Sequence, residues 1–142
     1  MRIRLLMLGK TRGAEARALL AEYVKRIGRA CPIELTEVRD GEAALKKLDA
    51  DRAATALLLD AGGKTYDSVV FARWIGEMRD RGTREVIFVC GDADGFPEKL
   101  RERVKQKISL SAMTYSHELA RVMLAEQIYR AFAILSGSPY PK

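Results

Sequence analysis

The residues best suited to chemistry lie in the short stretch GDADG, where Gly91 and Gly95 bracket the carboxylates of Asp92 and Asp94. Glycines let a backbone approach a ligand closely, but two carboxylates repel phosphate rather than cradle it. Such a turn suits a ligand that lacks phosphates and carries positive charge, as a sulfonium or an amine does. Turn chemistry alone leaves a second interpretation open, in which GDADG is simply a tight turn.

A second group of candidate residues lies near the C-terminus. His117, the sole histidine, precedes Arg121 by four positions, and Glu126 precedes Arg130 by four, so each pair shares one face of a helix. For Glu126 and Arg130, an ion pair is the structural interpretation. For His117, capping of a helix start and contact with a substrate both fit, and spacing does not decide between them.

The charge of the chain favours a polyanionic partner. Lys and Arg total 25 against 19 Asp and Glu, a net charge of +6, which raises the local concentration of nucleic acid. Basic residues gather from Arg2 to Arg12 and from Lys99 to Lys107, where they either dock RNA or form solvated surface. The chain has no GxxxxGK[ST] and no GxGxxG after a strand, which argues against a nucleotide phosphate as ligand.

Alternating strands and helices must position these residues. Apolar runs at Ile3 to Leu8, Ala56 to Leu59 and Val86 to Cys90 indicate strands, and the last two are expected to be central strands covered on both faces. Ile33 to Val38 and Ile108 to Leu110 indicate two more. The order predicts one α/β domain over residues 1–142, with a mostly parallel sheet and helices on both faces. Helical periods are expected over residues 14–27, 41–48 after the N-cap Asp40, about 69–78, a short stretch from Pro97, and from Ser116 or His117 to about Leu135.

Three loops follow the carboxyl ends of the best strands: Asp60 to Lys64, Gly91 to Gly95 and Ser111 to Ser116. Ligands bind at that edge of open α/β sheets, so these loops are expected to form one site.

The last helix has two apolar faces and therefore two partners. Its own sheet can cover one face, which leaves the other for a second subunit, and a homodimer follows. The alternative is a helix wholly buried within its own chain. The first face holds Leu124, Ile128, Ala131, Phe132 and Leu135, and the second Leu119, Val122, Met123 and Ala133.

The two cysteines, Cys31 and Cys90, have no CxxC spacing, which favours a reducing compartment, and Cys90 is expected to be a buried thiol because it lies in an apolar run. No apolar run approaches the length of a membrane span, and the start of the chain is too short and too soon charged for a signal peptide. We therefore expect a cytoplasmic protein without a membrane partner and without a bound metal.

The chain resembles the ribosomal RNA large subunit methyltransferase H family, one of the knotted SPOUT methyltransferases, over essentially its whole length. The matching stretches are IRLLMLGK at the start, LLLDAGGK at 57–64, GDADG at 91–95, LSAMT at 110–114 and HELARVMLAEQIYRA at 117–131. The resemblance implies a C-terminal trefoil knot that binds S-adenosylmethionine and an obligate homodimer. It also implies methylation of N3 of a pseudouridine in 23S ribosomal RNA within the assembled ribosome.

The resemblance also implies which residues form the site. Those expected to line the cofactor are Leu59, Gly91, Asp92, Gly95, Leu110, Ser111, Ala112, Met113, Thr114 and Tyr115. Those expected at the substrate, in a site composed from both subunits, are His117, Glu126, Arg130, Tyr140 and Lys142. Arg130 or Lys142 is expected to stabilise the N3 anion that forms when the ring loses its proton.

Two positions depart from the family pattern. Asp92 replaces a second glycine in the turn, which predicts either weaker cofactor binding or an adjusted geometry, and Pro141 replaces a tail histidine. Two alternatives to the family reaction follow. One is a noncatalytic RNA-binding dimer that keeps the fold, and the other is a methyltransferase with a different RNA target.

Overall fold

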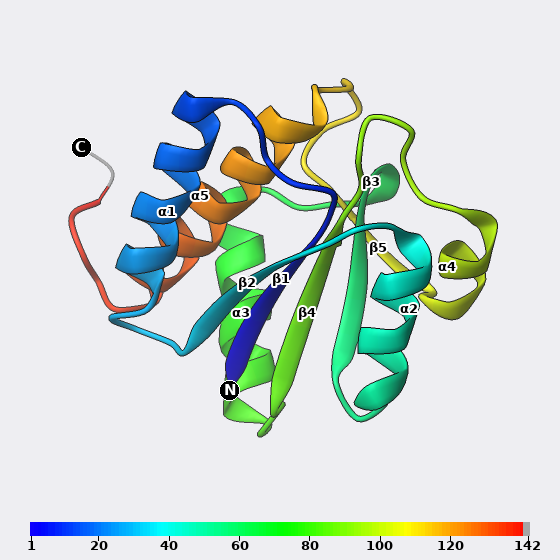
Figure 1. Cartoon of the computed structure of the whole chain (residues 1–142). Helices are drawn as coiled ribbons and strands as arrows, with labels where there is room; N and C mark the ends of the chain where they lie inside the picture. Colours follow the sequence, from blue (N-terminus) through cyan, green and yellow to red (C-terminus); the bar gives the residue numbers. More distant parts are fainter. Residues whose placement is uncertain (141–142) are drawn as a thin grey trace.

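A computed structural model of the protein describes residues 1–140. Strands and helices alternate along the chain, and all five strands join one parallel sheet in the order β2-β1-β4-β3-β5. Figure 1 shows the sheet between two layers of helices. The elements are β1 (Arg2–Leu8), α1 (Ala14–Ile27), β2 (Ile33–Val38), α2 (Gly41–Ala50), β3 (Thr55–Thr65), α3 (Ser68–Asp80), β4 (Glu85–Cys90), α4 (Glu98–Arg103), β5 (Gln106–Ser109) and α5 (His117–Leu135).

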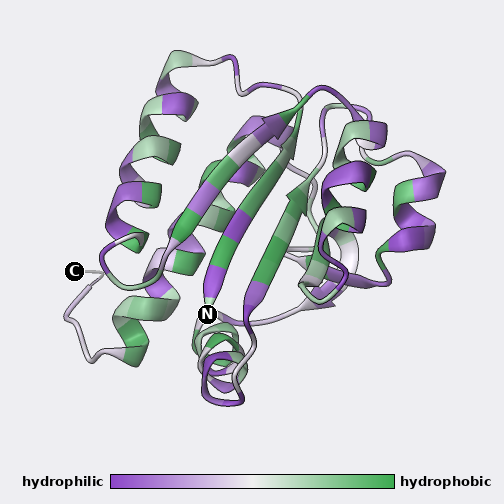
Figure 2. Ribbon diagram, turned by 60° about the horizontal axis from the view of Figure 1, so that its bottom comes forward, coloured by the Kyte–Doolittle hydropathy of each residue, from purple (hydrophilic) through white to green (hydrophobic). Residues whose placement is uncertain are grey.

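The core has two halves because successive strand residues point to opposite faces. On one face, Ile3, Leu5 and Phe88 are buried among side chains of α1, α3 and α5. On the other, Leu6 and Ile87 are buried among side chains of α2 and α4. Figure 2 shows the apolar residues of the strands between these layers. The expected α/β architecture, with helices on both faces, is confirmed.

The helix boundaries follow local chemistry. Asp40 accepts a hydrogen bond from the Ala43 N–H and begins α2 as expected, and Asp67 does the same for α3 through the Val70 N–H. Ser116 caps α5 by accepting from the Leu119 N–H at 3.3 Å. Gly82 follows α3 with a φ of +82°, a left-handed conformation that glycine adopts without strain.

Strands β3 and β5 differ from the sequence prediction. β3 continues to Thr65, so the expected loop from Asp60 to Lys64 is the irregular second half of a strand whose pairing with β5 shifts between Leu59 and Lys64. Gly63 permits the close approach, because a Cβ there would lie 2.7 Å from backbone atoms of β5. β5 runs from Gln106 to Ser109 and so begins two residues before the expected start at Ile108. The apolar pattern missed these two residues because both are polar. Strand β4 is central as expected, while β3 lies between β4 and β5.

Helix α5 packs against both α1 and α3 of its own chain. This covers part of the face that was expected to remain for a second subunit. Val122 and Ala133 are buried, whereas Leu119 is 52% exposed. The trefoil knot and the homodimer stay predictions of the family resemblance.

Candidate active site

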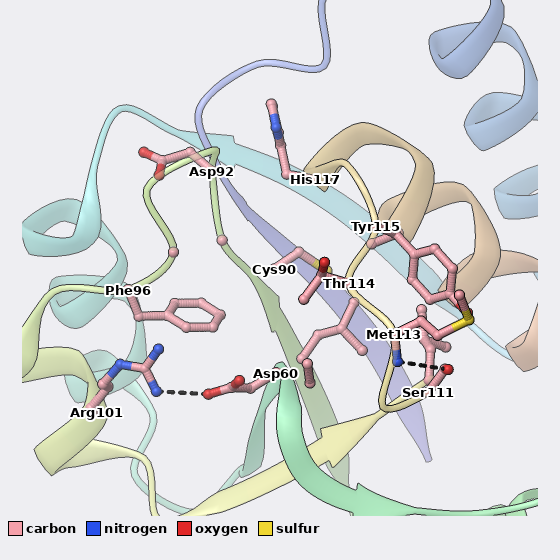
Figure 3. A pocket seen from close by; sticks show the side chains of 16 residues that line it. Asp60, Cys90, Asp92, Phe96, Arg101, Ser111, Met113, Thr114, Tyr115 and His117 are labelled. Atoms are coloured by element: carbon pink, nitrogen blue, oxygen red, sulfur yellow. Dashed lines mark hydrogen bonds and ion pairs between the residues drawn. The ribbon is translucent and has the colours of Figure 1, made fainter.

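A pocket of about 200 Å³ lies at the carboxyl ends of β3, β4 and β5, where the sequence places it. Its lining comes from the second half of β3, the turn after β4 and the loop after β5, with α5 beginning at its rim (Figure 3). Nine of the ten expected cofactor residues line it, and only Ala112 does not. The nine are Leu59, Gly91, Asp92, Gly95, Leu110, Ser111, Met113, Thr114 and Tyr115.

The turn after β4 is both a tight turn and a wall of the pocket. The Gly95 N–H donates to the carbonyl of Asp92 at 3.0 Å, and the Asp94 N–H donates to the Asp92 carboxylate at 2.8 Å. Gly95 has a φ of +79°, and a Cβ on Gly91 would lie 2.8 Å from the carbonyl oxygen of Gly95. These two glycines are therefore required by the shape of the turn.

The position of Asp92 does not require a glycine. Its φ is not positive, and its side chain points away from the pocket in Figure 3, at the outer end of the turn. The side chain stabilises the turn instead of crowding the pocket. Asp94, the other carboxylate of the sequence GDADG, is exposed and does not line the pocket.

Asp60 supplies a carboxylate to the pocket; the sequence analysis placed the segment that begins with it at this edge of the sheet but gave Asp60 itself no role. Its Oδ2 lies 2.7 Å from Nη1 of Arg101 of α4, and its Oδ1 accepts from the Gly62 N–H at 3.1 Å (Figure 3). The hydrogen bond from Arg101 is the main cause that lowers the pKa of Asp60 below its ordinary value. Arg101 also lies 5.6 Å from the ring centroid of Phe96, another lining residue.

The floor of the pocket at Cys90 and the wall formed by the loop after β5 carry no charged side chain. Cys90 is 2% exposed, and burial raises the pKa of its thiol to about 12. In the loop after β5, the Met113 N–H donates to the Ser111 hydroxyl at 3.0 Å, and the Ser109 hydroxyl donates to the Ser111 carbonyl at 2.8 Å. The loop is thus held by its own serines. The Met113 side chain is 72% exposed at the rim.

His117 lies at the rim and does not cap α5, because Ser116 has that role. Its ring points away from the Asp60–Arg101 pair in Figure 3. This removes the capping explanation for the histidine, and its contact with a substrate stays a prediction.

Arg121 is the main residue that the sequence analysis misjudged. It was considered only as a neighbour of His117 on a helix surface, yet it is 0% exposed. Its guanidinium donates to the carbonyls of Leu8 at 2.6 Å, Gly9 at 3.0 Å and Gly91 at 3.2 Å, and to the hydroxyl of Thr11 at 2.9 Å. Arg121 therefore ties the end of β1 to the first residue of the cofactor turn. Its place among apolar residues of α5 was the one signal in the sequence.

Glu126, Arg130 and Tyr140 form a separate cluster farther along α5. Nε of Arg130 donates to Glu126 at 2.8 Å, and the Tyr140 hydroxyl donates to the same carboxylate at 3.2 Å. The hydrogen bond from Glu126 raises the pKa of Arg130. Burial first, and then Tyr23 and Glu126, raise the pKa of Tyr140. The expected Glu126–Arg130 ion pair is confirmed.

This cluster does not join the pocket within one chain. Glu126 follows His117 by nine residues, a rise of about 13 Å along a helix, and it lines a second cavity of about 500 Å³ beside α1 and α3. The structure thus divides the expected substrate residues into His117 at the pocket and a distant group. Pro141 and Lys142 lie outside the described residues.

Two negative findings apply to residues 1–140. They contain no group of three or more His, Cys, Asp or Glu side chains suited to hold a metal ion. No helix among them is long and apolar enough to span a membrane.

The fold and the pocket define a SPOUT methyltransferase. The family model described as "Predicted SPOUT methyltransferase" matches residues 1–141. Among solved structures, the tRNA (m1G37) methyltransferase from Aquifex aeolicus is similar with a TM-score of 0.62 and 14% identity, over 100% of this chain and 75% of that chain. The SpoU methyltransferase AviRb from Streptomyces viridochromogenes, solved in complex with AdoMet, has a TM-score of 0.57 and 12% identity, over 91% of this chain and 57% of that chain. At these identities the likeness shows the fold.

Curated relatives are similar over nearly their full length. The ribosomal RNA large subunit methyltransferase H of Pelobacter propionicus is 42% identical over 151 residues, and that of Geotalea daltonii is 40% identical over 153 residues. Each alignment covers 99% of this chain and 99% of the relative. The chain belongs to the ribosomal RNA large subunit methyltransferase H family.

Proposed function

We propose that this protein transfers a methyl group from S-adenosylmethionine to N3 of a pseudouridine in 23S ribosomal RNA of the assembled ribosome. It is an S-adenosylmethionine-dependent methyltransferase of ribosomal RNA, as its full-length similarity to curated large subunit methyltransferases indicates. The observation that carries the proposal is the pocket, because nine residues expected at the cofactor from the sequence line one cavity.

The chemistry of the pocket fits this cofactor. Asp60, whose pKa is lowered, places a carboxylate in the lining and neutralises Arg101, and Asp92 holds a second carboxylate at the outer end of the turn. Negative charge complements a sulfonium and an ammonium group and disfavours phosphates. Leu59, the turn from Gly91 to Gly95 and the loop from Leu110 to Tyr115 are the residues that would hold the cofactor. When bound, it supplies an electrophilic methyl group.

The protein's part in the reaction is to position the base and to manage one proton. N3 of a uracil-like ring is protonated at neutral pH, so a cation that stabilises the N3 anion lowers the barrier. Arg130 suits this role because its guanidinium is charged at neutral pH and its hydrogen bond to Glu126 holds it in one orientation. His117, half-buried at the rim with its ring pointing away from the Asp60–Arg101 pair, suits contact with the incoming nucleotide.

A homodimer would bring these parts together. The cluster of Glu126, Arg130 and Tyr140 lies too far along α5 to reach the pocket of its own chain, so a second copy is the natural source of these side chains at that pocket. Apolar residues are exposed around the second cavity and beside it, which supports an interface there. They are Leu19 at 48%, Val69 at 55%, Val70 at 38% and Leu119 at 52% exposure.

We also infer a single domain over residues 1–142 and a cytoplasmic location. One sheet connects residues 2–109, and α5 packs back on it, which supports a single unit. The ribosomal substrate supports the location. The trefoil knot is part of the same proposal, supported by membership in the family.

The test is to incubate the protein and methyl-labelled S-adenosylmethionine with ribosomes from a strain that lacks the modification, and to locate the label by mass spectrometry. We expect label at N3 of a 23S pseudouridine. Label only on another RNA would identify a methyltransferase with a different target. Absence of both label and cofactor binding would favour a noncatalytic RNA-binding dimer.

The composite site needs its own test. Sedimentation should show a dimer, and mixing an inactive His117→Ala variant with an inactive Arg130→Met variant should restore activity in mixed dimers. Activity that stays absent after subunit exchange would place both residues in one chain's site.

A further inference from the structure

The loop between β1 and α1, Gly9 to Gly13, presents two cations from an ordered backbone. Lys10 and Arg12 are exposed, while Thr11 between them is 1% exposed. The alternation sends both charged side chains outward and anchors the loop through its middle residue. A loop of this kind needs a structural reason for its order, since short exposed loops are often mobile.

The reason lies in the first turns of α5. Arg121 donates to the Gly9 carbonyl and to the Thr11 hydroxyl, as described above. The carboxylate of Glu118 accepts from the backbone N–H groups of Arg12 and Gly13, the latter at 3.0 Å. A Cβ at Gly13 would lie 2.9 Å from the Glu118 carboxylate, so a larger residue there would displace this contact.

Side chains of β2 and α1 also bond the loop backbone, at Thr11. The Thr11 N–H donates to the carboxylate of Glu37 of β2 at 2.8 Å, and Arg17 of α1 donates to the Thr11 carbonyl at 2.7 Å. The loop backbone is therefore fixed by four side chains: Arg17 of α1, Glu37 of β2, and Glu118 and Arg121 of α5. Binding a ligand here loses little backbone entropy.

The loop adjoins the cofactor pocket. Arg121 bonds both Gly9 and Gly91, and Glu118 follows the rim residue His117. In Figure 3 the chain leaving β1 rises between Asp92 and His117. Lys10 and Arg12 thus stand beside the mouth of the pocket.

The basic stretch from Arg2 to Arg12 is divided by the structure. Arg2 and Arg4, at the opposite end of β1, pair with the buried carboxylate of Glu85 at 3.1 and 3.5 Å. In the described part of the chain, neither Lys10 nor Arg12 pairs with a carboxylate. The charge that remains available from this stretch is therefore concentrated beside the pocket.

Resting on the function proposed above, we propose that the β1–α1 loop is the docking site for RNA backbone phosphates next to the target nucleotide, with Lys10 and Arg12 as the contacts. The carboxylate of Asp60 in the pocket and that of Asp92 at the outer end of the turn repel phosphate, whereas the loop beside the pocket carries these two cations. That distribution lets a base enter while the backbone stays at the rim. Phosphate contacts of this kind set position rather than sequence preference.

The test compares two double variants with the same charge change. Lys10→Gln with Arg12→Gln removes the proposed contacts. Arg29→Gln with Arg81→Gln is the matched control, because both arginines are exposed in loops at the opposite edge of the sheet. Affinity for 23S ribosomal RNA is measured against salt concentration, with methylation of ribosomes and S-adenosylmethionine binding measured alongside.

We expect the Lys10/Arg12 variant to bind RNA about tenfold or more weakly near 0.1 M salt, with a salt slope smaller by about two, since each phosphate contact contributes a slope of about 0.9. Its KM for ribosomes should rise while kcat and cofactor affinity stay within about twofold. The control should match the parent. Equal RNA affinity in both variants, or a changed cofactor affinity in the Lys10/Arg12 variant, would overturn the proposal.

The RNA-binding readout separates this proposal from the proposed function. If the parent binds RNA through the loop but transfers no methyl group, the docking site stands and the methylation target is wrong. If the parent methylates ribosomes and the loop variant is unchanged in KM and salt slope, the reaction stands and the docking site is wrong.

Discussion

Replacing Arg121 with methionine tests how the pocket is held together. Methionine keeps an unbranched chain of similar reach but removes every donor of the guanidinium. The change leaves the carbonyls of Leu8, Gly9 and Gly91 and the hydroxyl of Thr11 without this partner. Because Arg121 is fully buried, solvent screening does not weaken these contacts.

The expected loss in the free energy of unfolding follows from the number of acceptors that lose their donor. Each buried acceptor left unsatisfied costs roughly 1–3 kcal/mol. Water entering the vacated space will satisfy about half of them, and removing a buried charge returns part of its desolvation penalty. We therefore expect a loss of about 3 kcal/mol in the free energy of unfolding, which corresponds to a Tm lower by roughly 9 °C at this chain length.

The same change should weaken cofactor binding, because Gly91 begins the turn that lines the pocket. We expect about a tenfold loss of S-adenosylmethionine affinity, equivalent to about 1.4 kcal/mol. Urea unfolding can be followed by the fluorescence of Trp74, which stacks on Tyr66 and lies near Phe88 in the core. Calorimetric titration measures the cofactor affinity at a temperature where the variant is folded.

Two further variants decide the interpretation. Arg121→Lys keeps the charge with fewer donors and should recover part of both losses. Leu48→Ala, on the buried face of α2, should lower the free energy of unfolding by roughly 2–5 kcal/mol yet leave cofactor affinity unchanged. A Met variant within about 1 kcal/mol of the parent would refute the reasoning on stability. An equal loss of cofactor affinity in the Leu48 variant would refute the link to the turn.

Three further experiments, two on variants and one on the unaltered protein, have definite expected outcomes. Because Arg101 lowers the pKa of Asp60, this carboxylate contributes stability above its unfolded pKa that is lost as pH falls through the folded value. Arg101→Met should raise the Asp60 pKa in a carboxyl NMR titration and remove less than about 1 kcal/mol of stability near neutral pH, since the pair is partly exposed. Cys90, with a pKa of about 12 and a buried thiol, should resist maleimide labelling at pH 8 until urea unfolds the chain, and rapid native labelling would contradict its burial. Gly91→Ala should abolish measurable cofactor binding, because the new Cβ meets the Gly95 carbonyl at 2.8 Å; a variant that still binds in calorimetry would show that the turn can relax.

Local pattern was enough to predict most of the fold. Apolar runs such as Val86 to Cys90 become buried strands because both of their faces are covered, and Asp40 caps a helix through contacts that span three residues. The pocket could be placed because parallel strands end at one edge of the sheet. These features depend on neighbours in sequence or on the layer architecture.

The features that were not predicted depend on contacts between distant parts of the chain. Strand pairing with β5 extends β3 through Asp60, although its glycines suggested a loop. Arg121 looks like a surface residue by type, and only the carbonyls of two strand ends reveal its role. The separation of Glu126 from the pocket follows from the direction of α5, which helical spacing does not provide.

The contact between Arg121 and Leu8 has a consequence for how the molecule is made. The two residues are 113 positions apart, and β1 itself pairs with β4, whose first pairing joins Arg2 to Glu85. Long-range parallel pairing makes folding slow, because loop-closure entropy is lost before the contacts form. A growing chain that ends before α5 holds the Leu8 and Gly91 carbonyls without their donor. Synthesis of α5 is therefore the step at which a nascent chain first acquires a complete pocket, so the cofactor site cannot form before this helix has been made.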